Sequence, residues 1–175
     1  METTLIEPAL FAYTALFVVI AMVTDARTLR IPNWIVVAIA LAYAVRAVLM
    51  PETTQPVYDV GIGVAIFATG WIFHDVFKWQ FPFAPGDWKI LAVVAMWLGP
   101  WLGFMCALYM GAIGGLMSLV FVLARRFPGL QALLYRLMPG LTLPKAQLNT
   151  IPYGLAIGAA TLMMMWQQVT TLGVV

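Results

Sequence analysis

The stretch DWKILAVVAMWLGP, residues 87–100, contains a mainly apolar run that is too short to cross a membrane by itself. Trp88 to Leu98 is eleven residues, about 16 Å of helix, before a Gly-Pro pair interrupts it. A membrane-spanning helix needs roughly 20 residues to cross about 30 Å of hydrocarbon. This helix therefore either begins below one membrane surface or ends short of the other. A recessed start would place Asp87 within the membrane layer.

The rest of the chain indicates a polytopic membrane protein. Of its 175 residues, 63% are hydrophobic and 9% are charged, and the mean hydropathy is +0.96. A soluble domain carries about 25% charged residues. Apolar runs predict six transmembrane helices, at about 8–24, 32–50, 58–79, 88–99, 101–124 and 152–172. We expect one all-α membrane domain over residues 1–175, with a short fourth helix. The first run lacks the basic residues that open a secretory signal, so we expect a retained helix.

The charged residues predict the orientation of these helices. Eight of the nine Lys and Arg residues fall on one predicted side: Arg27, Arg30, Lys78, Lys89, Arg125, Arg126, Arg136 and Lys145. The positive-inside rule makes that side cytoplasmic. Four acidic residues fall on the other side: Glu2, Glu7, Glu52 and Asp59. We therefore expect a multi-pass protein of the cytoplasmic membrane, with both termini outside. Arg46 is the exception, and we expect its long stem to reach the outer interface.

The longest polar connection, residues 125–150, contains a helical pattern. Four leucines recur there at the spacing i, i+3, i+4, i+7: Leu130, Leu133, Leu134 and Leu137. This spacing predicts an amphipathic helix on the cytoplasmic membrane surface, in contact with lipids.

Two pairs of glycines stand four residues apart inside predicted helices. They are Gly111 with Gly115 and Gly154 with Gly158. Small residues at this spacing allow close helix packing, either within the chain or across a homodimer, and the sequence leaves both open.

Several other classes of function are disfavoured by the composition. A net charge of +2 is too small to suggest a nucleic-acid partner. The single Cys106 excludes an intramolecular disulfide and a CxxC zinc site. His74 and Asp75, near the inner end of the third helix, are either interfacial residues or groups that tune the catalytic pair proposed next. A lone histidine is poor evidence for metal, so we expect no metal and no cofactor.

Two carboxylates in unusual places are the candidate catalytic residues. Asp25 is predicted at the cytoplasmic end of the first helix, and Asp87 at the cytoplasmic start of the fourth. An Asp in or beside a membrane span is costly unless it faces the protein interior or water. Two Asp residues that face each other share one proton, so that one activates water while the other donates to a carbonyl oxygen. This is aspartic protease chemistry, and it needs no metal, thiol or histidine.

The ends of the helices suggest how that proton is divided. Asp87 is predicted at a helix N-terminus, where the dipole favours the anion, and Asp25 at a C-terminus, where it does not. We therefore expect Asp25 to hold the shared proton more of the time. Simpler interpretations stay open: Asp25 caps a helix or pairs with Arg27 or Arg30, and Asp87 is an N-cap. The two residues are also compatible with proton relay in a proton-coupled transporter.

Three segments carry a resemblance to a known family. RIPN at 30–33, shortly after Asp25, GDWKILA at 86–92 and IPYGLAI at 151–157 resemble, in order and membrane placement, the type IV prepilin peptidases. These are membrane aspartic proteases with a GxGD-type motif, in which Ala84 and Pro85 here occupy the first two positions. The resemblance extends from about residue 10 to 170. The chain looks like the short form associated with tight-adherence pili, because the cysteine-bearing methyltransferase region of the long form has no counterpart.

This resemblance implies cleavage of the positively charged leader of prepilin substrates at the cytoplasmic membrane face, without N-methyltransferase activity. Asp25 and Asp87 match the catalytic aspartates of the family. Two alternatives remain. One is a non-catalytic pilus assembly subunit, and the other is a protease that cuts within substrate helices.

Four neighbours of the aspartates are expected to support the active-site loops. Gly86 has no side chain, so the backbone can lie close to an extended peptide. Pro32 and Asn33 open the second helix and set the loop that presents Asp25. Lys89 is expected to position this loop or to reach lipid phosphate.

Overall fold

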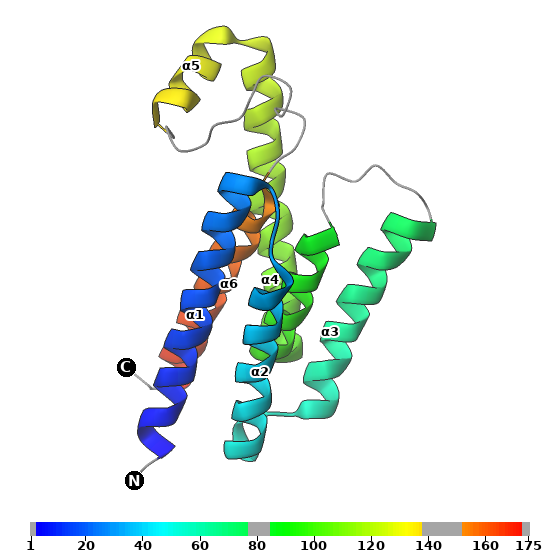
Figure 1. Cartoon of the computed structure of the whole chain (residues 1–175), viewed down its shortest axis with the longest axis vertical. Helices are drawn as coiled ribbons and strands as arrows, with labels where there is room; N and C mark the ends of the chain where they lie inside the picture. Colours follow the sequence, from blue (N-terminus) through cyan, green and yellow to red (C-terminus); the bar gives the residue numbers. More distant parts are fainter. Residues whose placement is uncertain (1–2, 77–84, 138–151, 173–175) are drawn as a thin grey trace.

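The computed structural model describes residues 3–76, 85–137 and 152–172, and these form helices and their connections without a strand. The helices are α1 (Thr3–Thr28), α2 (Asn33–Leu49), α3 (Pro56–Trp71), α4 (Pro85–Arg126), α5 (Pro128–Leu137) and α6 (Tyr153–Leu172) (Figure 1). A short 3₁₀ turn, Pro51–Thr53, precedes α3, and a π-helical turn, Ile72–Val76, follows it. The expected all-α class is confirmed.

The long helix α4 is a hairpin of two antiparallel legs. Gly99 has φ 79° and ψ 173°, a conformation that glycine adopts easily and other residues do not. A Cβ atom added to Gly103 would lie 3.0 Å from the Cα atom of Ala95. In a continuous helix, residues eight positions apart are separated by about 12 Å. Residues 85–98 therefore form a first leg and residues 100–126 a return leg, and these legs are the predicted fourth and fifth helices (Figure 1).

The first leg of α4 lies at the centre of the helical bundle. Helices α2, α3 and α6 all contact α4, and α1 contacts α2 and α6. Every residue from 90 to 95 is buried, so this leg is surrounded on all sides, as expected for a helix without a polar face. The leg is about 20 Å long, which confirms the short fourth helix.

Outer helices expose apolar side chains, as membrane helices do. Val57, Val64 and Phe67 of α3 are among the exposed large hydrophobic residues. Among the described residues, three segments are long and apolar enough to cross a membrane: Ile6–Thr28, Pro56–Asp75 and Gly86–Ala124, the last being the hairpin. Helix α2 is apolar but shorter. The six crossings thus remain a prediction.

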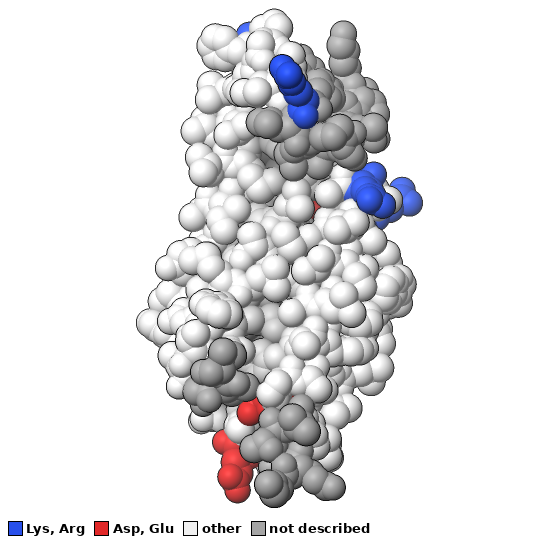
Figure 2. Space-filling view, turned by 90° about the vertical axis from the view of Figure 1, so that its left-hand side faces the viewer, with Lys and Arg blue, Asp and Glu red and all other residues white. Residues whose placement is uncertain are grey.

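Charged side chains separate toward the two ends of the molecule (Figure 2). We call one the basic end, where α1 and α3 end and both legs of α4 have their outer termini (Figure 1). The other is the acidic end, which holds Glu7, Glu52 and Asp59; α1 begins and α6 ends there. This separation agrees with the predicted orientation. Lys78, Lys145 and Glu2 lie outside the described residues.

The sequence suggested that Arg46 reaches the outer interface, but in the structure it does not. Its side chain is 2% exposed, and it contacts Glu7 of α1 and the backbone carbonyl of Trp97 in α4. The interface prediction was wrong because both partners come from distant parts of the chain. A buried ion pair with an additional hydrogen bond holds the guanidinium away from water.

The two glycine pairs behave differently. Added Cβ atoms at Gly154 and Gly158 would collide with Asp25 and Met22, so this pair packs α6 tightly against α1. Added Cβ atoms at Gly111 and Gly115 would meet nothing within 4 Å. Close packing is therefore confirmed for the second pair only.

Helix α5 confirms the helix predicted in the fifth loop. Leu134 faces the return leg of α4 across an apolar cavity of about 320 Å³, which Pro152 and Leu155 also line. The placement of α5 on a membrane surface stays a prediction. Residues 138–150 of the same loop lie outside the described residues.

The hairpin predicts unequal effects of two leucine substitutions in the return leg. Gly103→Leu should lower the free energy of unfolding by about 1–3 kcal/mol relative to Gly115→Leu, because only Gly103 packs against the other leg. Both variants gain the same helix propensity, so the comparison isolates packing. Thermal unfolding in detergent measures it, and equal stabilities would contradict the hairpin.

Candidate active site

Asp25 lies in the last turn of α1 with its side chain buried. The residue is 3% exposed. The helix ends just after it because Leu29 takes a left-handed conformation, with φ 54°, and its N–H donates to the Asp25 carbonyl at 2.8 Å. A left-handed leucine costs roughly 1–2 kcal/mol, so the surrounding structure must hold this turn. Asp25 therefore lies at the basic end, just before the turn from α1 into α2.

The first turn of α6 holds the Asp25 carboxyl group. The backbone N–H of Gly154 donates to Asp25 Oδ2 at 2.7 Å. A helix N-terminus presents unpaired N–H groups and favours a negative charge. The expectation that Asp25 lies only at a helix C-terminus was therefore incomplete. A Cβ at Gly154 would lie 2.6 Å from the Asp25 Cβ, so this contact requires glycine.

Asp87 lies in the first turn of α4, as predicted, and is 4% exposed. Pro85 is the first residue of the helix, where its missing N–H costs little. The dipole of the first leg favours a carboxylate at this position. Both candidate aspartates are thus buried at the basic end. That they share a proton stays a prediction.

The supporting residues join the start of α4 to the loop after α1. A Cβ at Gly86 would lie 3.6 Å from the Cβ of Ile31, so the two backbones approach closely. Lys89 Nζ donates to Oδ1 of Asn33, which is the first residue of α2, at 3.3 Å. Pro32 is the N-cap of α2, in an extended conformation. These contacts fix the loop that follows Asp25 against the helix that carries Asp87.

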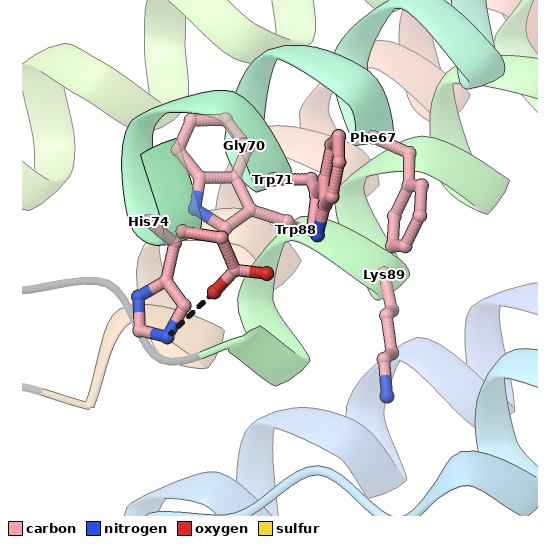
Figure 3. Close-up of a pocket in the computed structure, with 7 residues that line it drawn as sticks. Phe67, Gly70, Trp71, His74, Trp88 and Lys89 are labelled. Atoms are coloured by element: carbon pink, nitrogen blue, oxygen red, sulfur yellow. Dashed lines mark ion pairs between the residues drawn. The ribbon is translucent and has the colours of Figure 1, made fainter. Parts of the chain in front are cut away.

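A pocket of about 260 Å³ opens beside the start of α4 (Figure 3). It is lined by residues of α3, its π-helical turn and α4: Phe67, Gly70, Trp71, His74, Asp75, Trp88 and Lys89. Gly70 allows the Trp88 ring to pack directly on the α3 backbone. His74 and Asp75 are about half exposed, with Nε2 and Oδ1 3.8 Å apart. This exposure agrees with an interfacial position for both residues.

Sequence reasoning assigned Gly154 to helix packing and gave it no role in the active site. The segment IPYGLAI marked this region, but a contact between residues 129 positions apart needs the folded chain to reveal it. Within the described ranges, no three His, Cys, Asp or Glu side chains gather as metal ligands. The expected absence of a metal stays a prediction.

Comparison with known families bears on this arrangement. The model of the type IV leader peptidase family matches residues 12–123, which include both aspartates. The chain belongs to this family. Comparisons with curated proteins and with solved structures found no match. Membership makes the chain a leader peptidase of the aspartic type. The matched region ends before α5 and α6, so the Gly154 contact of this leader peptidase lies outside it.

The Asp25–Gly154 contact predicts the effect of adding one methyl group. Gly154→Ala should reduce leader cleavage about a hundred-fold, because the added Cβ displaces the Asp25 carboxyl group. Gly61→Ala in α3, where a Cβ meets nothing, is the matched control and should cleave normally. Cleavage rates at equal protein levels measure both. Equal rates would show that α6 does not position Asp25.

Proposed function

We propose that this leader peptidase is a membrane-embedded endopeptidase that removes the N-terminal leader of type IV prepilin-like substrates at the cytoplasmic membrane face. Asp25 and Asp87 are the proposed catalytic pair. The observation that carries the proposal is the burial of two carboxylates, from α1 and α4, at one end of a member of the leader peptidase family.

The proposed reaction uses one proton shared by the two carboxyl groups. The ionised carboxylate takes a proton from water, and the water oxygen attacks the carbonyl carbon of the scissile peptide bond. The protonated carboxyl group donates its proton to the carbonyl oxygen, which gives a neutral tetrahedral intermediate. One carboxyl group then protonates the leaving nitrogen while the other, ionised carboxylate takes a proton from a hydroxyl group of the intermediate, so that the C–N bond breaks and the pair again holds one proton.

The surroundings of the two aspartates suit these steps. The Gly154 N–H orients one oxygen of Asp25 and leaves the other for water or substrate. Gly86 offers a backbone without a side chain next to Asp87, where an extended substrate can approach. The contact of Lys89 with Asn33 holds the connecting loop in place.

The separation of charge supports the proposed topology. The basic end carries the aspartates and, under the positive-inside rule, faces the cytoplasm. We infer six crossings with both termini outside, in the cytoplasmic membrane, and contact with lipids at α5. Gly111 and Gly115 leave an open surface at which a homodimer would fit. We further propose the short form that acts on tight-adherence-type prepilins, without N-methyltransferase activity, because the only cysteine is buried in α4.

The test is leader removal from a co-expressed tight-adherence-type prepilin. Asp25→Asn and Asp87→Asn should each reduce cleavage by more than about a thousand-fold, since neither asparagine can act as acid or base. Glu52→Gln, an exposed carboxylate at the acidic end, should cleave like the wild type. The mass of the prepilin measures cleavage, at matched membrane levels of each variant.

Other results would favour other functions. Normal cleavage by either Asn variant would reject the catalytic pair. A wild-type chain that leaves several such prepilins intact would point to a proton-coupled transporter or an assembly subunit. A product cut inside the hydrophobic helix would indicate an intramembrane protease.

The shared proton predicts how cleavage depends on pH. With both carboxyl groups protonated there is no base, and with both ionised there is no acid. The value of kcat/KM should therefore fall on both sides of an optimum. Purified protein in lipid nanodiscs with a prepilin peptide allows this measurement, and a profile with one limb only would contradict a two-carboxylate mechanism.

A further inference from the structure

A second buried polar cluster lies at the acidic end, away from the aspartate pair. It consists of Glu7, Tyr43, Arg46 and Asp59, and we call it the acidic-end anchor. These residues come from α1, α2 and α3, and they surround the point at which α4 reverses. Arg46 and Asp59 are 2% and 5% exposed. Nothing in the proposed reaction uses them.

Arg46 holds the end of the first leg of α4. Its Nη1 donates to the Trp97 carbonyl at 3.1 Å, and its Nη2 contacts Glu7 Oε1 at 3.2 Å. The guanidinium carbon also lies 5.1 Å from the centre of the Trp97 ring, and 5.3 Å from that of Phe11. In a continuous helix the Trp97 carbonyl would accept a hydrogen bond four residues later, but the break at Gly99 removes that partner. Arg46 replaces it.

Asp59 lies beside the turn itself. Its Oδ2 accepts hydrogen bonds from the Tyr43 hydroxyl and the Gln55 N–H, both at 2.9 Å. Its Oδ1 would lie 3.3 Å from a Cβ added to Gly99, so the carboxylate lies beside this glycine. The turn of α4 therefore has the hydrogen bond from Arg46 on one side and the carboxylate of Asp59 next to it on the other.

The middle of the first leg has no comparable contacts along its axis. Residues 90–95 are apolar and fully enclosed, and apolar packing is non-directional. Charge-assisted hydrogen bonds are directional and fix a position more strictly. Since Trp97 and Asp87 lie about 15 Å apart on one rigid helix, a displacement at the anchor is transmitted to Asp87.

We propose that Arg46 is a positioning residue, which sets the position of Asp87 relative to Asp25 by holding the Trp97 carbonyl at the opposite end of the first leg. The effect of Arg46 on the position of the first leg, which we call the geometric part, can be tested without measuring cleavage. The effect on cleavage rests on the proposed function of the aspartate pair.

A disulfide between the start of α4 and the loop after α1 tests the geometric part. The added Cβ of Gly86 lies 3.6 Å from the Ile31 Cβ, within the roughly 3.5–4.5 Å that a disulfide needs. In a Cys106→Ala background, Ile31→Cys with Gly86→Cys should cross-link readily under mild oxidation. Adding Arg46→Met should slow cross-linking about ten-fold or more, because the first leg of α4 is no longer held in a fixed position relative to the loop after α1. Adding Glu52→Gln instead is the control and should leave the rate unchanged.

A second variant keeps this test decisive if Arg46→Met fails to fold. Arg46→Lys keeps the positive charge for Glu7 but lacks the planar fork that reaches Glu7 and Trp97 together. It should also slow cross-linking, by a smaller factor. Cross-linking at the wild-type rate in the folded Arg46 variants would overturn the proposal.

Kinetics with the otherwise unmodified chain test the effect on cleavage. Both Arg46 variants should lower kcat about ten- to a hundred-fold with KM within about twofold, because a shift near 1 Å at the reacting groups impairs catalysis and not leader binding. A purely structural role would reduce the amount of active protein, which active-site titration corrects, and would leave kcat unchanged. If Asp25→Asn and Asp87→Asn still cleave, the proposed function fails, while the cross-linking result still decides the role of Arg46.

Discussion

The reversal of α4 at Gly99 is the constraint on which the rest of the structure depends. A helix that stops inside an apolar bundle leaves carbonyl groups without their partners, and such groups are costly where water is scarce. Arg46 of α2 supplies a replacement donor to the Trp97 carbonyl, and Asp59 of α3 lies beside Gly99. The chain can then reverse inside the bundle after a short first leg. Without this reversal the chain after Gly99 would not come back to the end that carries Asp25, where α6 begins.

Helix termini contribute to the polar environment at the basic end. Asp25 lies where α1 ends and α6 begins, and Asp87 lies where α4 begins. The N-termini of α4 and α6 each favour negative charge, whereas the proposed pairing of the two carboxylates would oppose it. A pair in which only one member is ionised at a time is compatible with both effects. The single shared proton stays a proposal.

Much of this arrangement was predictable because its signals are local in sequence. Apolar runs broken by Gly and Pro gave the six helices, with boundaries wrong by a few residues, as at Pro85 and Thr3. A carboxylate next to an apolar run is conspicuous in any sequence of this composition, so Asp25 and Asp87 could be chosen. The three family segments then connected them to leader peptidases.

Features that depend on distant partners were not predictable. Arg46 seemed to be an interfacial residue, because its partner on Trp97 is a backbone group that only the turn at Gly99 makes available. Gly111 and Gly154 have the same spacing motif, yet only the second packs, since the motif does not say which face meets a neighbour. Lys89 was expected to position an active-site loop or to reach lipid phosphate, but its partner Asn33 could not be named from the sequence.

The hydrogen bond between Asp25 and Gly154 has a consequence for the synthesis of the protein. It joins the first helix to α6, across 129 positions of the chain. A membrane protein is made from its N-terminus onward, so the first aspartate leaves the ribosome long before the backbone group that orients it. The hydrogen bond that orients Asp25 can therefore form only after α6 has been synthesised.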